Sequence, residues 1–461
     1  MLSKAKKNSP YFEKFLFSLS QFLSGEKILD YMAELEKTQW LSPEELQQLQ
    51  QAKLKRLLEH AYQNVPYYQV KFKELGILPE KIKDLEAWGK IPLLEKKVVR
   101  DDYTSLCSKH RHERWSAHRT SGSTGTPVTV FWNSSGHAFN MAMMYRCRSW
   151  HELDVGTREI RVWGEPLTIK GKIISKLKGF FLSRRDLSIL KMSEENINLL
   201  FAQCRSFRPD FLYGYATALY EFAELIKKEN LEGHGLGFKV VISTSEILHD
   251  YQKQLIESVF RCKVINEYGS GDAGLIAFEC PAGNLHLQAD GVLIEFLKDG
   301  KPVSAGQMGE ITITPLHNYA MPLIRYKIGD CGILSDKVCS CGRGLPVMEL
   351  KIAKEVELIH TLSGKTFTGE IFDNINQALN DKRWIKQFRV TQKSIKDFEV
   401  EIVRGEVFSE NYLEIFRKEM IKVLGPEIKV TFTFVPQIKR EPSGKLKYFV
   451  SELASGSSEK G

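Results

Sequence analysis

Residues 238–270 read FKVVISTSEILHDYQKQLIESVFRCKVINEYGS, and their pattern decides the fold. An apolar, β-branched run is followed by a helical pattern over 250–260 and by a second β-branched run from residue 262. A strand, a helix and a strand in this order indicate a βαβ unit and a parallel sheet. The segment NEYGSGDAG (266–274) follows the second strand, at the carboxyl end where α/β folds bind ligands.

The same alternation extends upstream, and a different pattern begins downstream. Strand-like runs at 127–132, 158–164 and 209–215 alternate with helical patterns at 136–150, 193–206 and 216–230. From about residue 285, short strands separated by Gly and Asn turns predict an antiparallel, barrel-like section. The C-terminal part has strands at 385–391, 397–403 and 428–434 and a helix at 409–424. We therefore expect an α/β protein with a large N-terminal domain and a small, mobile α+β C-terminal domain.

The length of 461 residues favours two or three domains. We expect a large domain over 1–350 with a helical part at 1–110, a hinge at 351–357, a small domain at 358–452 and a disordered tail at 453–461. Within the helical part, Ser42 and Pro43 have the residue types of an N-cap and a first helical position. The segment NVPYY (64–68) interrupts this helical pattern.

The N-terminus predicts an amphipathic helix. Its expected apolar face consists of Phe12, Phe15, Leu16, Leu19, Phe22 and Leu23. We favour packing of this face on the protein itself, because most amphipathic helices face a core. A weak membrane-surface association through residues 11–23 is the alternative, since lysines flank the apolar face.

Composition and charge narrow the class of protein. The net charge is +8, from 65 basic and 57 acidic residues, which suits an anionic substrate without requiring nucleic acid. The sequence has no basic arm or aromatic–basic signature for nucleic acid, and no apolar run of the ~18–20 residues that a membrane span needs. Eight cysteines without a secretory signal do not indicate a disulfide framework, so we expect a cytoplasmic protein.

Four motifs could carry chemistry. TSGSTGTPV (120–128) combines hydroxyls with glycines whose backbone N–H groups could cradle an anion. Asp272 in NEYGSGDAG could hold Mg²⁺, Asp330 in RYKIGD (325–330) could accept hydrogen bonds from ribose hydroxyls, and Lys445 in EPSGKLK (441–447) could neutralise phosphate. Each motif alone is also compatible with a surface turn or a solvated basic tail.

The order of the motifs along the chain resembles the adenylate-forming superfamily, and most closely the phenylacetate–coenzyme A ligase family. Within that family it is similar to the branch associated with capsule and surface polysaccharides. The segments that carry the resemblance span nearly the whole chain: LLEHAYQNVPYYQ, KIPLLEKKVVRDDY, TSGSTGTPV, PDFLYGYATALY, STSEIL, EYGSGDAG, IRYKIGD and CSCGRG.

The resemblance implies ATP-dependent, AMP-forming activation of a small-molecule carboxylic acid and transfer of the acyl group to coenzyme A. It implies that the β,γ-phosphates bind Ser121, Gly122, Ser123, Thr124, Gly125 and Thr126. It implies that the loop Ser243, Thr244, Ser245 and Glu246 lies along the adenine, and that Tyr268 and Gly269 border the adenine and the acyl pocket. It also implies that Asp330 binds the ribose hydroxyls and Asp272 a magnesium ion. Lys445, Thr124 and Asp272 are the catalytic candidates, with Lys445 bridging carboxylate and phosphate.

Two positions depart from the family pattern. Asp272 stands where the family usually has a glutamate, so a metal contact would be longer or mediated by water. At the expected hinge the family usually has a Gly–Arg pair followed by Asp, whereas this chain has Ala353, Lys354 and Glu357. Lys354 keeps the charge of a nucleotide-binding position but lacks the bidentate geometry of arginine. Two alternatives therefore stay open: an adenylating transferase to an amine or sugar acceptor in surface-polysaccharide biosynthesis, and a catalytically weakened nucleotide-binding scaffold.

A structural metal site is also predicted. FECPAGNLH supplies Cys280 and His286, and VCSCGRG supplies Cys339 and Cys341. Three cysteines and one histidine suit tetrahedral zinc. Two separate pairs of reduced cysteines are the alternative, and Cys331 is close enough in sequence to substitute for one ligand.

Overall fold

The computed structural model describes residues 10–79, 82, 85–119, 128–163, 169–189, 192–352, 358–362, 366–368, 384–439 and 449–453. The chain divides into two compact units. One comprises Met1–Ser245 and Leu255–Leu350, and the other comprises Glu246–Gln254 and Lys351–Gly461.

The first unit begins with helices. They are α1 (Pro10–Ser24), α2 (Ile28–Thr38), α3 (Pro43–Asn64), α4 (Pro66–Leu75), α5 (Leu85–Gly89) and α6 (Lys96–Asp101). The hydroxyl of Ser42 accepts a hydrogen bond from the Glu45 N–H, and the Glu45 side chain bonds back to the Ser42 N–H, so the predicted N-cap is confirmed as a capping box. Val65 ends α3, and Pro66 begins α4, which explains the interruption at NVPYY.

Helix α1 packs on the protein with part of the expected face, whose residues Phe12, Phe22 and Leu23 have side chains outside the described part of the structure. Leu16 and Phe17 are buried, and the Phe17 ring meets the Tyr145 ring edge-on at 5.2 Å between centroids. Phe15, a predicted face residue, is instead 60% exposed. The assignment of Phe15 to the buried face was therefore wrong, because packing against Tyr145 selects Phe17.

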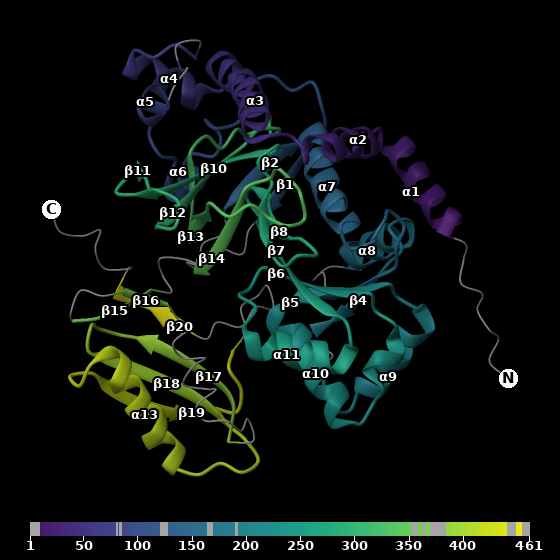
Figure 1. Cartoon of the computed structure of the whole chain (residues 1–461), viewed down its shortest axis with the longest axis vertical. Coiled ribbons are helices and arrows are strands. Elements are labelled where there is room, and N and C mark those ends of the chain that lie inside the picture. The colour runs from purple at the N-terminus through teal and green to yellow at the C-terminus, as the bar shows by residue number, and fades with distance from the viewer. Residues whose placement is uncertain are drawn as a thin grey trace. The chain divides into compact units, whose positions relative to one another are not determined.

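A 12-stranded sheet forms the centre of the first unit (Figure 1). Its order is β11-β10-β12-β13-β14-β9-β8-β7-β6-β5-β3-β4. The strands are β3 (Glu159–Trp163), β4 (Arg184–Ser188), β5 (Phe211–Tyr215), β6 (Val240–Thr244), β7 (Lys263–Ser270), β8 (Gly274–Glu279), β9 (Leu285–Leu287), β10 (Val292–Lys298), β11 (Lys301–Pro302), β12 (Met308–Pro315), β13 (Tyr326–Ser335) and β14 (Val347–Ile352). The connecting helices are α7 (Ser134–Ser149), α8 (Ile169–Phe181), α9 (Ile197–Phe207), α10 (Ala216–Lys228), the 3-10 helix η3 (Gly233–Leu236) and α11 (Asp250–Phe260).

The predicted α/β class is confirmed, with one difference in connectivity. Strands β4, β3, β5, β6 and β7 pair in parallel, as the βαβ pattern of 238–270 requires. The antiparallel strands do not form a sheet of their own, because β7 pairs antiparallel with β8 and continues the same sheet. The run at 127–132 is part of β2 (Thr129–Asn133), which pairs only with β1 (Trp115–Arg119) in a separate ribbon.

The second unit contains a four-stranded sheet of order β19-β18-β17-β20. Its strands are β17 (Ile385–Gln392), β18 (Asp397–Arg404), β19 (Lys429–Phe434) and β20 (Phe449–Ser451), with helix α13 (Asn411–Leu424) and the hairpin β15 (Leu358–His360) and β16 (Thr366–Thr368). Phe388, Val400 and Phe416 bring the sheet and α13 together in one apolar core. This α+β arrangement matches the elements predicted from the sequence.

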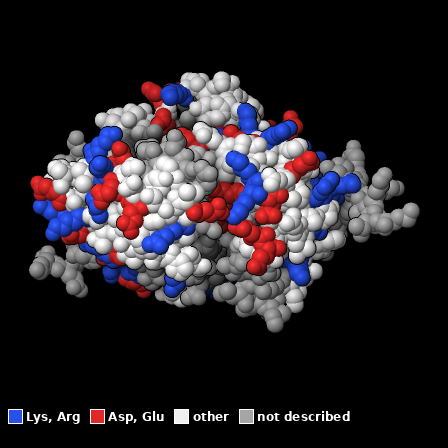
Figure 2. Space-filling view, turned by 90° about the horizontal axis from the view of Figure 1, so that it is seen from below, with Lys and Arg blue, Asp and Glu red and all other residues white. Residues whose placement is uncertain are grey.

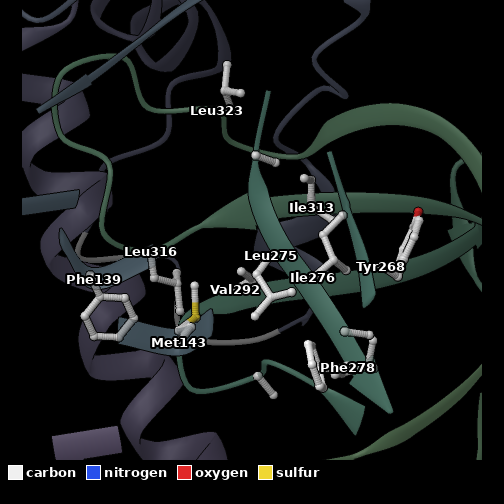
Figure 3. Packing of buried hydrophobic residues seen from close by; sticks show 14 of the residues in the cluster. Phe139, Met143, Tyr268, Leu275, Ile276, Phe278, Val292, Ile313, Leu316 and Leu323 are labelled. Carbon is white, nitrogen blue, oxygen red and sulfur yellow. The ribbon is translucent and has the colours of Figure 1, made fainter. Parts of the chain in front are cut away.

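The core of the first unit lies between α7 and the antiparallel part of the sheet. Figure 3 shows Phe139 and Met143 of α7 facing Val292 and Leu316, with Ile276 on a neighbouring strand. A Cβ on Gly291 would lie 2.4 Å from the Met143 sulfur and 2.8 Å from a ring carbon of Phe139, so any larger residue there would have to displace these side chains. The helix therefore sits close against the sheet.

A fully buried ion pair anchors α7. Both guanidinium NH groups of Arg146 donate to Asp290, at 2.9 and 3.2 Å, and both side chains are inaccessible to solvent. Arg146 also donates to the Leu35 carbonyl and to Gln288, and Thr38 donates to Asp290. Burial is the largest single effect and raises the pKa of Asp290, but the Arg146 charge, the hydrogen bonds from Arg146 and Thr38 and the Lys53 charge together outweigh it and lower that pKa. The carboxylate therefore stabilises the fold above the unfolded pKa of about 4 and loses that effect as the pH falls through its lowered value.

Charged side chains elsewhere are mixed. Figure 2 shows acidic and basic groups interspersed over the face in view.

Within the described ranges, no helix combines the length and apolar character that crossing a membrane requires.

We predict that Arg146→Met lowers the free energy of unfolding by about 3–5 kcal/mol, because it leaves Asp290 buried without its counter-charge. Urea unfolding of the full chain measures this loss, with Arg185→Met, an exposed arginine, as the matched control. The double variant Arg146→Met/Asp290→Leu should recover part of the loss. A single-variant cost no larger than that of the control would contradict the role of the pair.

Candidate functional site

Several predicted site residues lie outside the described residues. They are the loop residues Ser121, Gly122, Ser123, Thr124, Gly125 and Thr126, the hinge residue Lys354, and Lys445. The structure describes the remaining candidates, which fall at the carboxyl end of the parallel strands and at the turn-rich edge of the antiparallel section.

Tyr268 and Asp330, which the resemblance places at the nucleotide, contact each other. Tyr268 lies near the end of β7, and its hydroxyl donates to the Asp330 Oδ2 in β13 at 2.8 Å. Burial raises the pKa of Tyr268 well above its usual value, and the Asp330 charge adds to this effect, so the tyrosine remains a hydrogen-bond donor. Asp330 is thereby held as an acceptor beside a buried ring.

Asp272 is held by a reciprocal contact. The Tyr326 hydroxyl of β13 donates to the Asp272 Oδ2, in the turn after β7, at 2.6 Å. The two contacts are reciprocal, because Tyr268 of β7 donates to Asp330 of β13. Strands β7 and β13 are separated by β8, β9 and β14 in the sheet, a span of about 19 Å if the sheet were flat. Side-chain contacts across this span require the sheet to curl, which agrees with the barrel-like section expected from the sequence.

One oxygen of Asp272 is unsatisfied. The residue is 4% exposed, and its Oδ1 has no hydrogen-bond partner among the described residues. The Lys96 ammonium lies 4.0 Å from the other oxygen, Oδ2. A buried carboxylate oxygen without a partner has an unfilled requirement for a donor or a cation. The environment of Asp272 therefore fits a hard cation such as magnesium.

The turn between β7 and β8 depends on glycines. A Cβ on Gly269 would lie 2.7 Å from the Gly274 carbonyl oxygen, and Gly274 itself has φ +80°. The Asn140 side chain of α7 accepts a hydrogen bond from the Leu275 N–H at 2.8 Å and fixes the end of the turn. These contacts position the chain on both sides of Asp272.

The end of β6 carries further polar groups. Ser245 follows β6 with φ +64°, a strained conformation for a residue with a Cβ. Thr244 and Tyr213 both donate to the Glu267 Oε1, at 3.2 and 2.6 Å, whereas the Glu267 Oε2 and the Ser243 hydroxyl are buried without described partners. Glu246 follows Ser245 in the chain and is the first residue of Glu246–Gln254, a short segment that belongs to the second unit.

Sequence reasoning missed three of these groups. Lys96 and Tyr326 both lie within segments that carried the resemblance, but neither was assigned a role. Glu267 directly precedes Tyr268 and was also passed over. Spacing along the strand could have indicated Tyr326, because it lies four residues before Asp330 and side chains at even spacing lie on the same face of a strand.

The cysteines and the histidine predicted to bind metal form one cluster. One ligand atom from each of Cys280, His286, Cys339 and Cys341 lies within 4.8 Å of the others. The Cys280 and Cys339 sulfurs are 3.6 Å apart, and the Cys341 sulfur is 3.3 Å from the His286 Nε2. Cys331 lies in β13 and is not a member of this cluster.

The surroundings of the cluster suit a metal centre. The second ring nitrogen of His286 is 2.7 Å from the Leu345 carbonyl oxygen, the type of contact that orients a ligating histidine. Burial raises the pKa of the Cys280 thiol to about 11. Burial is the largest single effect and would raise the pKa of the Cys341 thiol, but the hydrogen bonds of Arg343, Cys339 and Cys280 together outweigh it and lower that pKa. Three thiols and an imidazole at this spacing are a ligand set that a tetrahedral metal accepts.

The fold is that of the adenylate-forming ligases. The crystal structure of 2-hydroxyisobutyryl-CoA ligase in the postadenylation state, in complex with R3-HIB-AMP, matches with a TM-score of 0.74 and 17% sequence identity, covering 91% of this chain and 92% of that one. The structure of the anthranilate CoA ligase AuaEII with anthranoyl-AMP matches with a TM-score of 0.51 and 12% identity, covering 72% of this chain and 65% of that one.

Sequence relatives confirm the resemblance found in the motifs. The chain is similar to phenylacetate-coenzyme A ligase of Thermus thermophilus (26% identical, 68% of this chain and 70% of the relative) and of Escherichia coli (24%, 86% and 85%). It is also similar to Protein CapK of Staphylococcus aureus (23%, 89% and 90%). Residues 359–452 match a family model described as the CapK C-terminal domain. The chain is therefore a relative of the phenylacetate–coenzyme A ligases and of CapK.

We predict that Tyr326→Phe lowers the free energy of unfolding by about 1–3 kcal/mol, because it removes the hydrogen bond to Asp272 in a buried setting. In an Asp272→Ala background the same substitution should cost less, since its partner is already absent. Thermal and urea unfolding measure both, with Tyr103→Phe, 39% exposed, as the control. Equal costs in the two backgrounds would show that the contact contributes nothing.

Proposed function

We propose that the protein activates a carboxylic acid with ATP and transfers the acyl group to coenzyme A. In the first step a carboxylate oxygen bonds to the α-phosphorus of ATP, and the bond to pyrophosphate breaks. In the second step a thiol bonds to the acyl carbon, and AMP leaves with its electron pair. The observation that carries the proposal is the pair of hydrogen bonds between Tyr268 and Asp330 and between Tyr326 and Asp272. These bonds join β13 to β7 and to the turn after β7, where the sheet curls.

The two aspartates of these pairs would each contact a different part of ATP. Asp330, held as an acceptor by Tyr268, would accept hydrogen bonds from the ribose hydroxyls. Asp272, with its unsatisfied Oδ1, would hold magnesium, which supplies positive charge beside the phosphates when bound. Lys96 lies near Asp272 and would add a further positive charge. The strained Ser245 and the neighbouring Glu246 would border the adenine.

The remaining roles fall on residues outside the described part of the chain. The loop from Ser121 to Thr126 would donate neutral hydrogen bonds to the β,γ-phosphates. Lys445 would reduce the repulsion between two anions, the carboxylate and ATP, as they approach. Charge neutralisation and positioning are the main requirements of phosphoryl-type transfer. Lys354 would contact the nucleotide from the hinge.

The full chain with ATP and magnesium should release pyrophosphate only when an accepted carboxylic acid is present. A panel of aryl, aliphatic and hydroxy acids, read by coupled pyrophosphate detection, tests this expectation. Lys445→Ala should lower the rate by at least about a hundredfold. Lys447→Ala, two residues away on the same basic segment, is the matched control and should retain activity. No release across the panel, or equal rates for the two variants, would count against the proposal.

A second acceptor class has specific support. The C-terminal segment matches the CapK domain, and CapK is associated with capsules. The hinge has Ala353, Lys354 and Glu357 where the family usually has a Gly–Arg pair and Asp. Both observations favour an adenylating transferase that passes the acyl group to an amine or sugar. Offering coenzyme A and amino sugars in parallel separates the two, because only the true acceptor accelerates AMP release. ATP binding without turnover with any acid would instead indicate a nucleotide-binding scaffold.

We further propose that Cys280, His286, Cys339 and Cys341 bind structural zinc. Protein purified without chelators should contain about one zinc ion per chain by elemental analysis. Cys339→Ser should lose the metal and unfold at a lower temperature, whereas Cys331→Ser, a nearby cysteine outside the cluster, should keep both properties. Wild-type protein free of zinc, with unfolding unaffected by added zinc, would overturn this assignment.

A further inference from the structure

Helix α8 packs on the protein with its small and polar side. The Ser175 hydroxyl donates to Asp186 of β4 at 2.6 Å. One turn later, a Cβ on Gly179 would lie only 2.6 Å from the Arg184 carbonyl oxygen, so the helix backbone lies against the chain at the start of β4. Most surface helices bury their apolar stripe and expose their polar one. In α8 this polarity is reversed.

The apolar side chains of α8 face outward. Ile173, Ile174, Leu177 and Phe180 are 55%, 43%, 58% and 61% exposed. Positions i, i+1, i+4 and i+7 fall on one side of a helix, so the four form a continuous stripe. Single exposed apolar residues are ordinary on protein surfaces, whereas a contiguous exposed patch indicates an interaction site.

Lysines border this stripe. Lys176 and Lys178 are exposed, and on a helical projection they fall on opposite sides of the stripe. The segment 169–181 contains four lysines and no acidic residue. Helix α1 contacts α8 (Figure 1), and its Phe15 is also exposed. An apolar surface framed by positive charge is therefore presented to solvent.

We propose that α8 docks the protein on an anionic membrane surface. The apolar stripe would enter the boundary between headgroups and acyl chains, and Lys176 and Lys178 would contact anionic headgroups on either side. A helix of 13 residues is about 20 Å long, so it would lie in the interface and not span it. A second copy of the chain fits less well, because a symmetric contact would bring the lysines of both copies together.

The proposal predicts flotation of the full chain with vesicles of phosphatidylcholine and phosphatidylglycerol, and less with phosphatidylcholine alone. The double variant Ile173→Ser/Leu177→Ser should bind at least about tenfold more weakly, because it removes two inserted side chains. Lys176→Glu should weaken binding by about fivefold or more, and added salt should weaken wild-type binding.

Matched controls are available in the same unit. Leu199→Ser removes a leucine that is 60% exposed on α9, and Lys227→Glu reverses an exposed lysine on α10. Both should bind vesicles like the wild type, and circular dichroism should confirm that all variants are folded. Equal flotation of stripe and control variants would overturn the proposal. Failure of the wild type to float, with a change of oligomeric state in the stripe variant, would assign the surface to a second copy instead.

Discussion

The buried Arg146–Asp290 ion pair is the contact on which the rest of the first unit depends. Removing one partner of a buried ion pair is strongly destabilising, because the other charge is left in the interior without its counter-charge. Here Arg146 bonds to Asp290, Gln288 and the Leu35 carbonyl, so α2, α7 and the turn before β10 must all be in place together. The N-terminal helices are therefore part of the same cooperative structure as the sheet.

The cysteine–histidine cluster and the turn that carries Asp272 are both linked by hydrogen bonds to this ion pair or to the helix that contains it. Gln288, which accepts from Arg146, donates to the His286 carbonyl at 3.0 Å and so links the pair to the cysteine–histidine cluster. On the other side, Asn140 of α7 accepts from the Leu275 N–H and fixes the turn that carries Asp272. Helix α7 thus contacts the turn that carries Asp272 through Asn140 and is linked to the cysteine–histidine cluster through Arg146 and Gln288.

The sequence was sufficient for the parts of the fold governed by local pattern. The βαβ order, the capping box at Ser42 and the strands of the second unit follow from periodicity and capping chemistry. The sequence indicated a barrel-like section, but the contacts Tyr268–Asp330 and Tyr326–Asp272 across three intervening strands could not be predicted, because they depend on how far the sheet curls. The burial of Phe17 in place of Phe15 likewise involves Tyr145, a residue far away in the chain. Helix α8 was missed because its apolar residues face solvent and two glycines interrupt its helical pattern. The Cys₃His cluster was accessible from composition and motif, since its ligand types are few and distinctive.

The central claim is that a carboxylate oxygen attacks the α-phosphorus of ATP. Isotope transfer tests this directly: the accepted acid, labelled with ¹⁸O in its carboxylate, is turned over with ATP, magnesium and the acceptor, and the AMP is analysed by mass spectrometry. Our account predicts that AMP carries one labelled oxygen, because AMP leaves with the oxygen that bridged acyl carbon and phosphorus. Unlabelled AMP, or label recovered in inorganic phosphate together with ADP, would contradict it.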